Sequence, residues 1–225
     1  MKAVVRRDLS IRPRMDALMK KLGVTEDFEE EFAQVYEVCA RVANPKYLYC
    51  KCEARQDAQH TYIGEEAFDS RIMRVELEGI DAVYPYAATC GTELYELALS
   101  TEDPLGRYWI DGFSEHALYL ASARALSEIE ELAGTDKISS MNPGSLDDFP
   151  LAEQKPLFRL LGDAESAIGL RLTDSCLMLP YKSSSGIYYA TESDFVSCAL
   201  CQRANCPNRR AEFDEMRYNT RYALA

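Results

Sequence analysis

Residues 139–189 decide the fold, and they read SSMNPGSLDDFPLAEQKPLFRLLGDAESAIGLRLTDSCLMLPYKSSSGIYY. The stretch opens on an Asn-Pro-Gly turn at 142–144, where glycine tolerates backbone angles that other residues refuse. Asp147 or Asp148 is then placed to cap a helix, and Pro150 suits its first position, where a missing N–H costs nothing. The sequence therefore predicts a turn followed closely by a helix.

The predicted helix is short, and β-structure follows it. Leucines at helical spacing give it an apolar face, Pro156 must bend or shorten it, and Gly162 ends it. After a second short helix, residues 170–179 form a β-like segment, and an aromatic strand at 187–189 follows Gly186.

This order of elements and motifs resembles a known family. The segment is similar to the C-terminal reactivation domain of cobalamin-dependent methionine synthase, and more closely resembles free-standing homologues of that domain in anaerobes. The matching residues are Pro143 and Gly144, then Leu172, Thr173, Asp174 and Ser175, then Ser183, Ser185, Gly186 and Tyr188. Over the first hundred residues the match weakens to a hydrophobic pattern.

The rest of the chain mixes both kinds of element. Strands are expected at 2–9, 46–53, 61–63 and 80–88, helices at 14–22, 27–43, 93–100 and 111–132, and either type at 68–77. The mixed pattern permits, and the resemblance implies, an α+β fold with a twisted, mainly antiparallel sheet flanked by helices. We expect one domain over residues 1–225, with a cysteine-rich C-terminal segment at 197–225.

Composition narrows the classes of partner. The formal net charge of -12 and a pI near 4.7 argue against nucleic acid, because phosphate binding needs clustered Lys and Arg. The sequence has neither an apolar run long enough to span a membrane nor a signal-peptide pattern. We therefore expect a cytoplasmic protein that binds no membrane.

Eight cysteines and two histidines leave thiolates as the main candidates for soft-metal ligands. Cys198 and Cys201 form a Cys-x-x-Cys pair, and Cys206 follows closely, so that these three could share one zinc ion or iron–sulfur cluster. A redox dithiol and inert thiols are the alternatives. The fourth ligand would be an external molecule or one of Cys50, Cys52, Cys90 and Cys176.

The resemblance also implies a ligand site. In the synthase domain the Pro-Gly turn contacts S-adenosylmethionine, and an acidic residue that falls nearest Glu128 binds the ligand amine. The residues implied in cofactor binding here are Asn142, Pro143, Gly144, Gly186, Tyr188, Tyr189 and Glu128. Two positions depart from the family pattern, because Ser140 replaces an arginine that anchors the ligand carboxylate and Ser145 replaces an aromatic residue.

Two functions remain open at this point. The resemblance implies reactivation of a corrinoid-dependent methyltransferase by reductive methylation with S-adenosylmethionine, in which the protein acts mainly by positioning. The alternative is a metal-containing accessory protein that docks on a corrinoid protein, or passes electrons to it, without binding S-adenosylmethionine. In both cases the expected partners are a corrinoid protein or cobalamin-dependent methyltransferase, and an electron donor protein.

Overall fold

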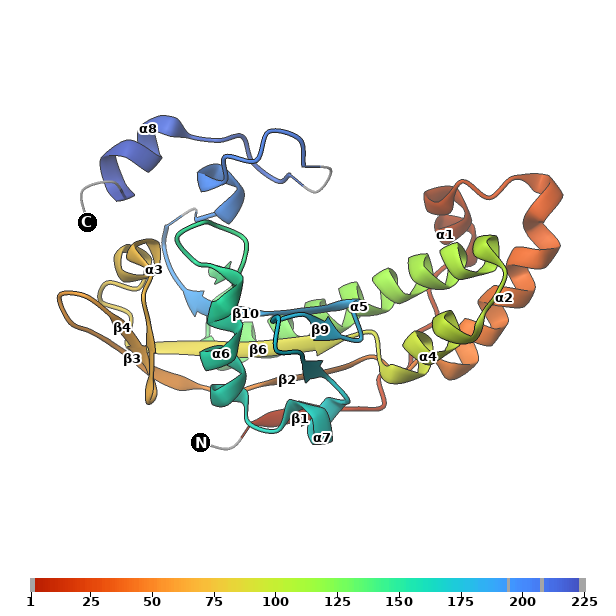
Figure 1. Cartoon of the computed structure of the whole chain (residues 1–225), viewed down its shortest axis with the longest axis horizontal. Helices are drawn as coiled ribbons and strands as arrows, with labels where there is room; N and C mark the ends of the chain where they lie inside the picture. The colour runs from red at the N-terminus through yellow and green to blue at the C-terminus, as the bar shows by residue number, and fades with distance from the viewer. Residues whose placement is uncertain (1–2, 194, 207–208, 223–225) are drawn as a thin grey trace.

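The computed structural model describes residues 3–193, 195–206 and 209–222, and its centre is an antiparallel sheet (Figure 1). Strand β6 (Ala82–Thr89) lies in the middle and pairs along one edge with β10 (Ser183–Ala190). Its other edge pairs first with β2 (Lys46–Tyr49) and then with β3 (Cys52–Gln56). Every strand pairing among the described residues is antiparallel, and the predicted fold class is confirmed.

Outer strands extend this centre on both sides. Strand β1 (Val4–Arg6) pairs with β2, and β7 (Ile138–Met141) pairs with β10. Strands β4 (Thr61–Ile63) and β5 (Glu66–Phe68) continue from β3, while β8 (Arg171–Leu172) and β9 (Met178–Leu179) form a separate hairpin. Strand β7 was not predicted, because the four-residue segment ISSM lacks a strong β pattern.

Pro85 lies within the central strand, where proline is normally excluded because it cannot donate a ladder hydrogen bond. The register of β2 and β3 against β6 is continuous, and the two strands are interrupted opposite Pro85, which cannot donate the second hydrogen bond of its pair with Cys50. Its own carbonyl still accepts a hydrogen bond from the Cys50 N–H at 3.0 Å. Pro85 therefore lies opposite the short break between β2 and β3.

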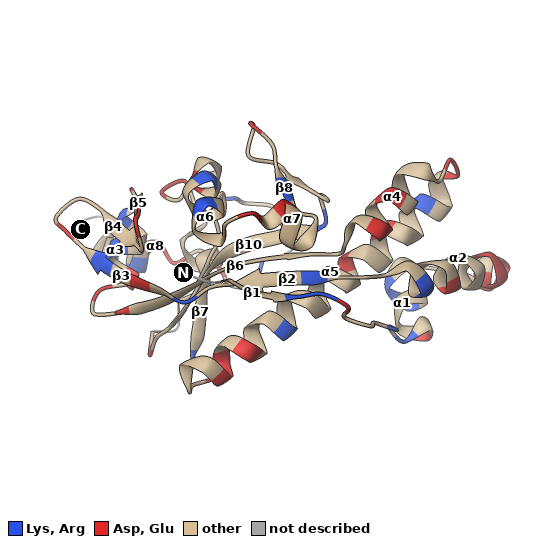
Figure 2. Cartoon of the chain, turned by 90° about the horizontal axis from the view of Figure 1, so that it is seen from below, with Lys and Arg blue, Asp and Glu red and all other residues tan. Residues whose placement is uncertain are grey.

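Helix α5 (Pro104–Ala133) runs along one face of the sheet, and Ala121, Ala125 and Ile129 pack there against a layer of tyrosines (Figure 2). The sequence predicted its start near Asp111, but it begins earlier because the Asp103 carboxylate accepts the N–H groups of the first turn. Gly112 lies where α5 meets Leu22, with only 2.4 Å between its would-be Cβ and the leucine Cδ2.

The opposite face is covered by α3 (Arg71–Glu76), α6 (Gln154–Leu161) and α7 (Ala164–Ile168). The ambiguous stretch 68–77 is mainly helical, because the Asp148 carboxylate accepts from Ser70 Oγ at 2.7 Å and from Ile72 N at 2.8 Å. Asp148 thus caps α3, and the prediction that it caps its own helix is wrong. A 3₁₀ turn, Leu151–Glu153, precedes α6 instead.

A helical arm projects from the sheet at the end where β6 stops (Figure 1). It consists of α1 (Met15–Leu22), α2 (Glu29–Val42), α4 (Thr92–Ser100) and the first half of α5. Edge-to-face contacts of Trp109 with Phe32, and of Tyr36 with Phe113, fill its core.

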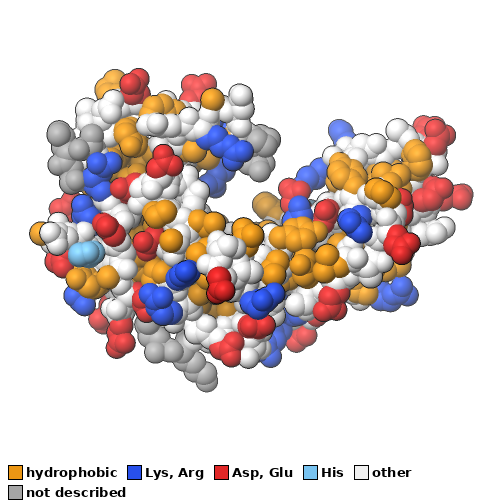
Figure 3. All heavy atoms as spheres, viewed as in Figure 1, with side chains coloured by type: hydrophobic (Ala, Val, Ile, Leu, Met, Phe, Trp, Pro, Cys, Tyr) orange, Lys and Arg blue, Asp and Glu red, His pale blue; other side chains and the backbone are white. Residues whose placement is uncertain are grey.

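The C-terminal segment folds back over the sheet domain through a 3₁₀ turn (Ser197–Leu200), α8 (Glu215–Arg217) and a π turn (Tyr218–Tyr222). Its anchor is the buried carboxylate of Glu76, which accepts from Ser193 Oγ at 2.9 Å, from Arg221 at 3.0 Å and from the Tyr222 hydroxyl. Figure 3 shows a hollow between this segment and the helical arm, with Lys or Arg side chains on the overhanging edge. Among the described residues, none of the helices could span a membrane.

Candidate functional site

The turn after β7 is joined to β10 by the side chain of Asn142. Its amide nitrogen donates to Ser185 O at 2.7 Å and to the Tyr86 hydroxyl at 2.8 Å. The register pairs Ile187 with Met141, where β7 ends, so the Asn142 side chain continues the ladder by one bond beyond that strand. The structure therefore brings together the two segments, 142–144 and 186–189, that the sequence singled out.

Gly186 is required for this close approach. A Cβ at this position would lie 2.4 Å from Asn142 Nδ2, 2.6 Å from Met141 O and 3.0 Å from a Tyr86 ring carbon. Gly144 is the other glycine with a local reason, because its φ of 83° is a left-handed conformation and its N–H donates to Phe149 O at 2.7 Å.

An open pocket of about 380 Å³ lies between the turn and β10. We call it the serine pocket, because Ser140, Ser183, Ser184 and Ser185 line it together with Asn142 and Pro143. Its volume falls in the range of small-molecule sites, about 300 to 1,000 Å³. The lining also includes Tyr86, Gln154, Tyr188 and Arg210.

Tyr188 and Tyr189 point to opposite faces, as alternation along a strand requires. Tyr188 stacks on Tyr86 with ring centroids 4.1 Å apart and lines the serine pocket, and burial together with Tyr86 raises the pKa of its hydroxyl. Tyr189 is fully buried in the core under α3 and α6 and does not line the serine pocket. The expectation that Tyr189 contacts a ligand does not agree with this position.

Glu128 lies on α5, and its carboxylate is already engaged. It accepts from Arg6 Nε at 2.8 Å, from the Tyr47 hydroxyl at 2.8 Å and from the Tyr49 hydroxyl at 3.0 Å. Burial acts to raise its pKa, and these three donors outweigh burial, so the pKa lies below its usual value. Its tyrosine partners belong to β2, across β6 from β10, and Glu128 lines none of the pockets described here. The family pattern therefore indicated a carboxylate whose hydrogen bonds are made to side chains of β1 and β2.

The cysteine-rich segment forms the wall of a second, neighbouring pocket of about 550 Å³, which we call the cysteine pocket. Cys198, Cys201 and Cys206 line it opposite Asn142 and Gly144. In the described ranges, however, no group of three or more His, Cys, Asp or Glu side chains is arranged to hold a metal ion. Pro207, which follows Cys206 directly, lies outside the described residues.

The backbone of this segment is arranged around the side chain of Arg209. The guanidinium of Arg209 donates to the carbonyl oxygens of Cys198 and Cys201 at 3.3 Å each, to that of Ala211 at 3.1 Å, and to that of Arg203. These contacts fix the backbone of the loop without a metal. Metal binding by the three thiols therefore stays a prediction that would require the loop to rearrange.

The thiol of Cys198 has a lowered pKa, unlike the thiols of the buried residues Cys39 and Cys90. Burial acts to raise its pKa, but the backbone N–H of Arg210, which lies 3.5 Å from the sulfur, and the Arg210 side chain lower it below its usual value. Burial instead raises the pKa of Cys39 and Cys90 to about 12. The thiol of Cys198 therefore ionises more readily than the thiols of Cys39 and Cys90.

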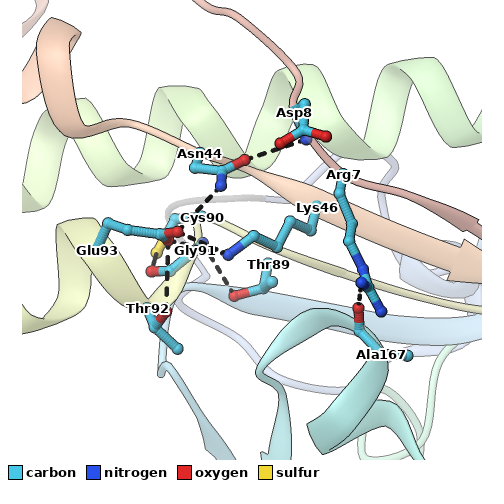
Figure 4. Close-up of polar contacts among 10 residues, drawn as sticks. All are labelled: Arg7, Asp8, Asn44, Lys46, Thr89, Cys90, Gly91, Thr92, Glu93 and Ala167. Atoms are coloured by element: carbon cyan, nitrogen blue, oxygen red, sulfur yellow. Dashed lines mark hydrogen bonds and ion pairs between the residues drawn. The ribbon is translucent and has the colours of Figure 1, made fainter.

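A second polar cluster occupies the turn after β6 and is satisfied internally (Figure 4). Lys46 Nζ contacts both carboxylate oxygens of Glu93, at 2.8 and 3.1 Å, and Asn44 donates to the same carboxylate at 3.0 Å. A Cβ on Gly91 would lie 2.4 Å from Asn44 O, so the close approach of these two segments requires glycine at this position. The cluster joins the arm to the sheet.

Comparison with known proteins bears on the fold and on the family resemblance. Residues 146–210 match the family model described as the activation domain of vitamin B12 dependent methionine synthase. The resemblance is confirmed. The structure is also similar to the crystal structure of the MetH reactivation domain bound to AdoHcy, with a TM-score of 0.62 and 15% identity over 86% of this chain and 80% of that one. No curated protein sequence matches the chain.

The activation-domain match runs from Leu146 through α6 and β10 to Arg210, and it includes most of the residues that line the serine pocket but not Ser140, Asn142 and Pro143. Sequence reasoning missed Tyr86, Gln154 and Arg210. Gln154 carries no motif, and Tyr86 lies in a strand that reads as core. Arg210 could have been suspected only from its place beside three cysteines in an otherwise acidic chain.

Proposed function

We propose that this protein holds S-adenosylmethionine in the serine pocket and thereby helps to reactivate a corrinoid-dependent methyltransferase. The observation that carries the proposal is the interlock of the Asn142 turn with β10 around Gly186, which makes a pocket of small-molecule size from the two matching motifs. The activation-domain match at 146–210 and the shared fold support it. The similar crystal structure is of a domain bound to AdoHcy, the product of methyl transfer from S-adenosylmethionine.

Methyl transfer from S-adenosylmethionine to a corrinoid requires little acid–base catalysis by the protein. A corrinoid on the partner accepts one electron from a donor protein and then the methyl group. As the methyl carbon–sulfur bond breaks, its electron pair stays on sulfur as a neutral thioether. Loss of the sulfonium charge makes the transfer effectively irreversible, so the chain has to bind and orient the donor molecule.

The partner we propose is a corrinoid protein with a basic or neutral docking surface. The chain has a formal net charge of -12, and acidic residues cluster at the start of α2 (Figure 2). Such charge affects the rate of encounter more than the final affinity. The association rate should therefore fall as the salt concentration rises, and a rate that does not depend on salt would contradict this electrostatic part.

A second candidate follows from Ser140, which lines the serine pocket where the family pattern has an arginine. Without that cation the protein could act as a docking or electron-transfer accessory that binds no S-adenosylmethionine. Calorimetric titration of the anaerobically purified chain with S-adenosylmethionine and with AdoHcy separates the two. We expect both to bind, and we expect Asn142→Ala to weaken both, while Ser100→Ala on α4 has no effect. Absence of binding to the native chain would leave the accessory role.

A further inference from the structure

Two buried polar groups in the serine pocket have no partner within the protein. The side-chain oxygen of Gln154 and the hydroxyl of Ser185 accept and donate no hydrogen bond in the described structure, although each residue is only 4% exposed. Buried polar atoms are nearly always paired, so an unpaired pair on one pocket wall indicates that something else supplies the partner. An oxygen from a carboxamide can only accept, which calls for a donor on the ligand.

Arg210 brings a positive charge to the same pocket from the C-terminal segment. Its side chain is exposed, and within the described ranges it forms no ion pair with a carboxylate. Its charge opposes the rise in the pKa of the Tyr188 hydroxyl and helps to lower the pKa of the Cys198 thiol, and its backbone lies next to Arg209, the residue around which the loop folds. Arg210 is therefore a cation that lines both the serine pocket and the cysteine pocket, and the N–H groups in the plane of its guanidinium are suited to a carboxylate.

Resting on the function proposed above, we propose that the serine pocket recognises a free amino-acid group, with Arg210 holding the ligand carboxylate and Gln154 and Ser185 holding its ammonium group. The cation that the family pattern carries at the Ser140 position is supplied here by the C-terminal segment instead. Ligand binding in this chain thus depends on the cysteine-rich segment. Glu128 is not available for the ammonium group, because its three hydrogen bonds hold it at β2.

The test uses three ligands that share the adenosine part and a sulfur atom: S-adenosylmethionine, its decarboxylated form, and 5′-methylthioadenosine, a neutral thioether that lacks the carboxylate, the ammonium group and the sulfonium charge. Titration calorimetry on the full chain should show the native protein preferring S-adenosylmethionine over the decarboxylated form by about 10- to 100-fold, the range expected for a charge-assisted pair. Arg210→Gln should abolish this preference and leave 5′-methylthioadenosine binding unchanged. Arg203→Gln, which removes the same charge from the same segment but lines only the cysteine pocket, should keep the preference.

The ratio of two affinities is independent of the fraction of variant that folds, so a partly unfolded Arg210→Gln protein still gives an answer. Equal loss of all three ligands on Arg210→Gln, or an unchanged preference, would overturn the assignment of Arg210. If the native chain binds none of the three, the proposed function fails, which is a different result.

Gln154 is tested by Gln154→Met, which keeps the length of the side chain and removes its polar end. Affinity for S-adenosylmethionine should fall about 5- to 20-fold, because the ammonium group loses an acceptor, while affinity for 5′-methylthioadenosine is retained. The unfolding midpoint of the ligand-free protein should not fall, since the oxygen has no partner to lose. A lowered midpoint with equal weakening of both ligands would mean that Gln154 only supports the fold.

Discussion

Replacing Gly186 with alanine tests whether the turn and the strand depend on one another. The added Cβ would lie 2.4 Å from Asn142 Nδ2 and 2.6 Å from Met141 O, and contacts under about 3.0 Å force a shift. Overpacking of this kind costs about 1 to 3 kcal/mol. Displacing Asn142 also loses its hydrogen bonds to Ser185 and Tyr86, at about 1 kcal/mol each. We therefore expect Gly186→Ala to lower the free energy of unfolding by about 3 to 5 kcal/mol.

Urea unfolding followed by far-UV circular dichroism measures this quantity, with Ser184→Ala on the same face of β10 as the control. The double variant with Asn142→Ala sharpens the test. Because removal of the Asn142 side chain relieves the closest contact but not the one with Met141 O, the cost of Gly186→Ala should drop by at least about 1 kcal/mol without vanishing. Additive effects of the two substitutions, or a Gly186→Ala protein within about 0.5 kcal/mol of the native one, would refute the reasoning.

Three further substitutions or measurements probe the surroundings of the site. Asp148→Ala should lower stability by about 1 to 2 kcal/mol in thermal unfolding because the Ile72 N–H and the hydroxyl of the N-cap residue Ser70 lose their acceptor at the start of α3, whereas Asp147→Ala should not. Glu76→Gln should release the C-terminal segment at a cost of about 1 to 3 kcal/mol, seen as faster limited proteolysis of that segment, and unchanged cleavage would count against it. Cys198 should react with iodoacetamide at lower pH than an ordinary thiol, since its lowered pKa makes the thiolate available earlier. Arg210→Gln should move that profile upward, and a profile that stays in place would exclude the role of Arg210.

The sequence determined most of the elements through local signals. Proline and glycine marked the turn at 142–144, apolar residues at three- and four-residue spacing marked α2, and a long pattern rich in Ala and Leu marked most of α5. The short motifs that carry the resemblance were also local, because a turn and a strand keep their residues close together in the chain. These signals were enough to predict the antiparallel α+β fold and the two segments that meet at Gly186.

Contacts between distant parts of the chain could not be predicted in this way. The side chain of Asp148 looked equally suited to its own helix, and only the packed structure directs it to α3, some seventy residues earlier in the chain. The same is true of Glu128, whose acceptor groups are used by donors on β1 and β2. The residues next to a carboxylate in the sequence do not indicate which distant donor will form a hydrogen bond with it.

The sequence by itself thus determined the fold class, the family resemblance and the two motifs of the candidate site, because those depend on periodicity and on residue type at short range. The tertiary structure alone decided that Arg210 and Gln154 face the same pocket as the serines of β10, that Tyr189 lies in the core, and that Arg209 occupies the centre of the cysteine loop. Those outcomes depend on which surfaces pack together, and a long-range contact between two side chains leaves no periodic trace in the segments that carry them.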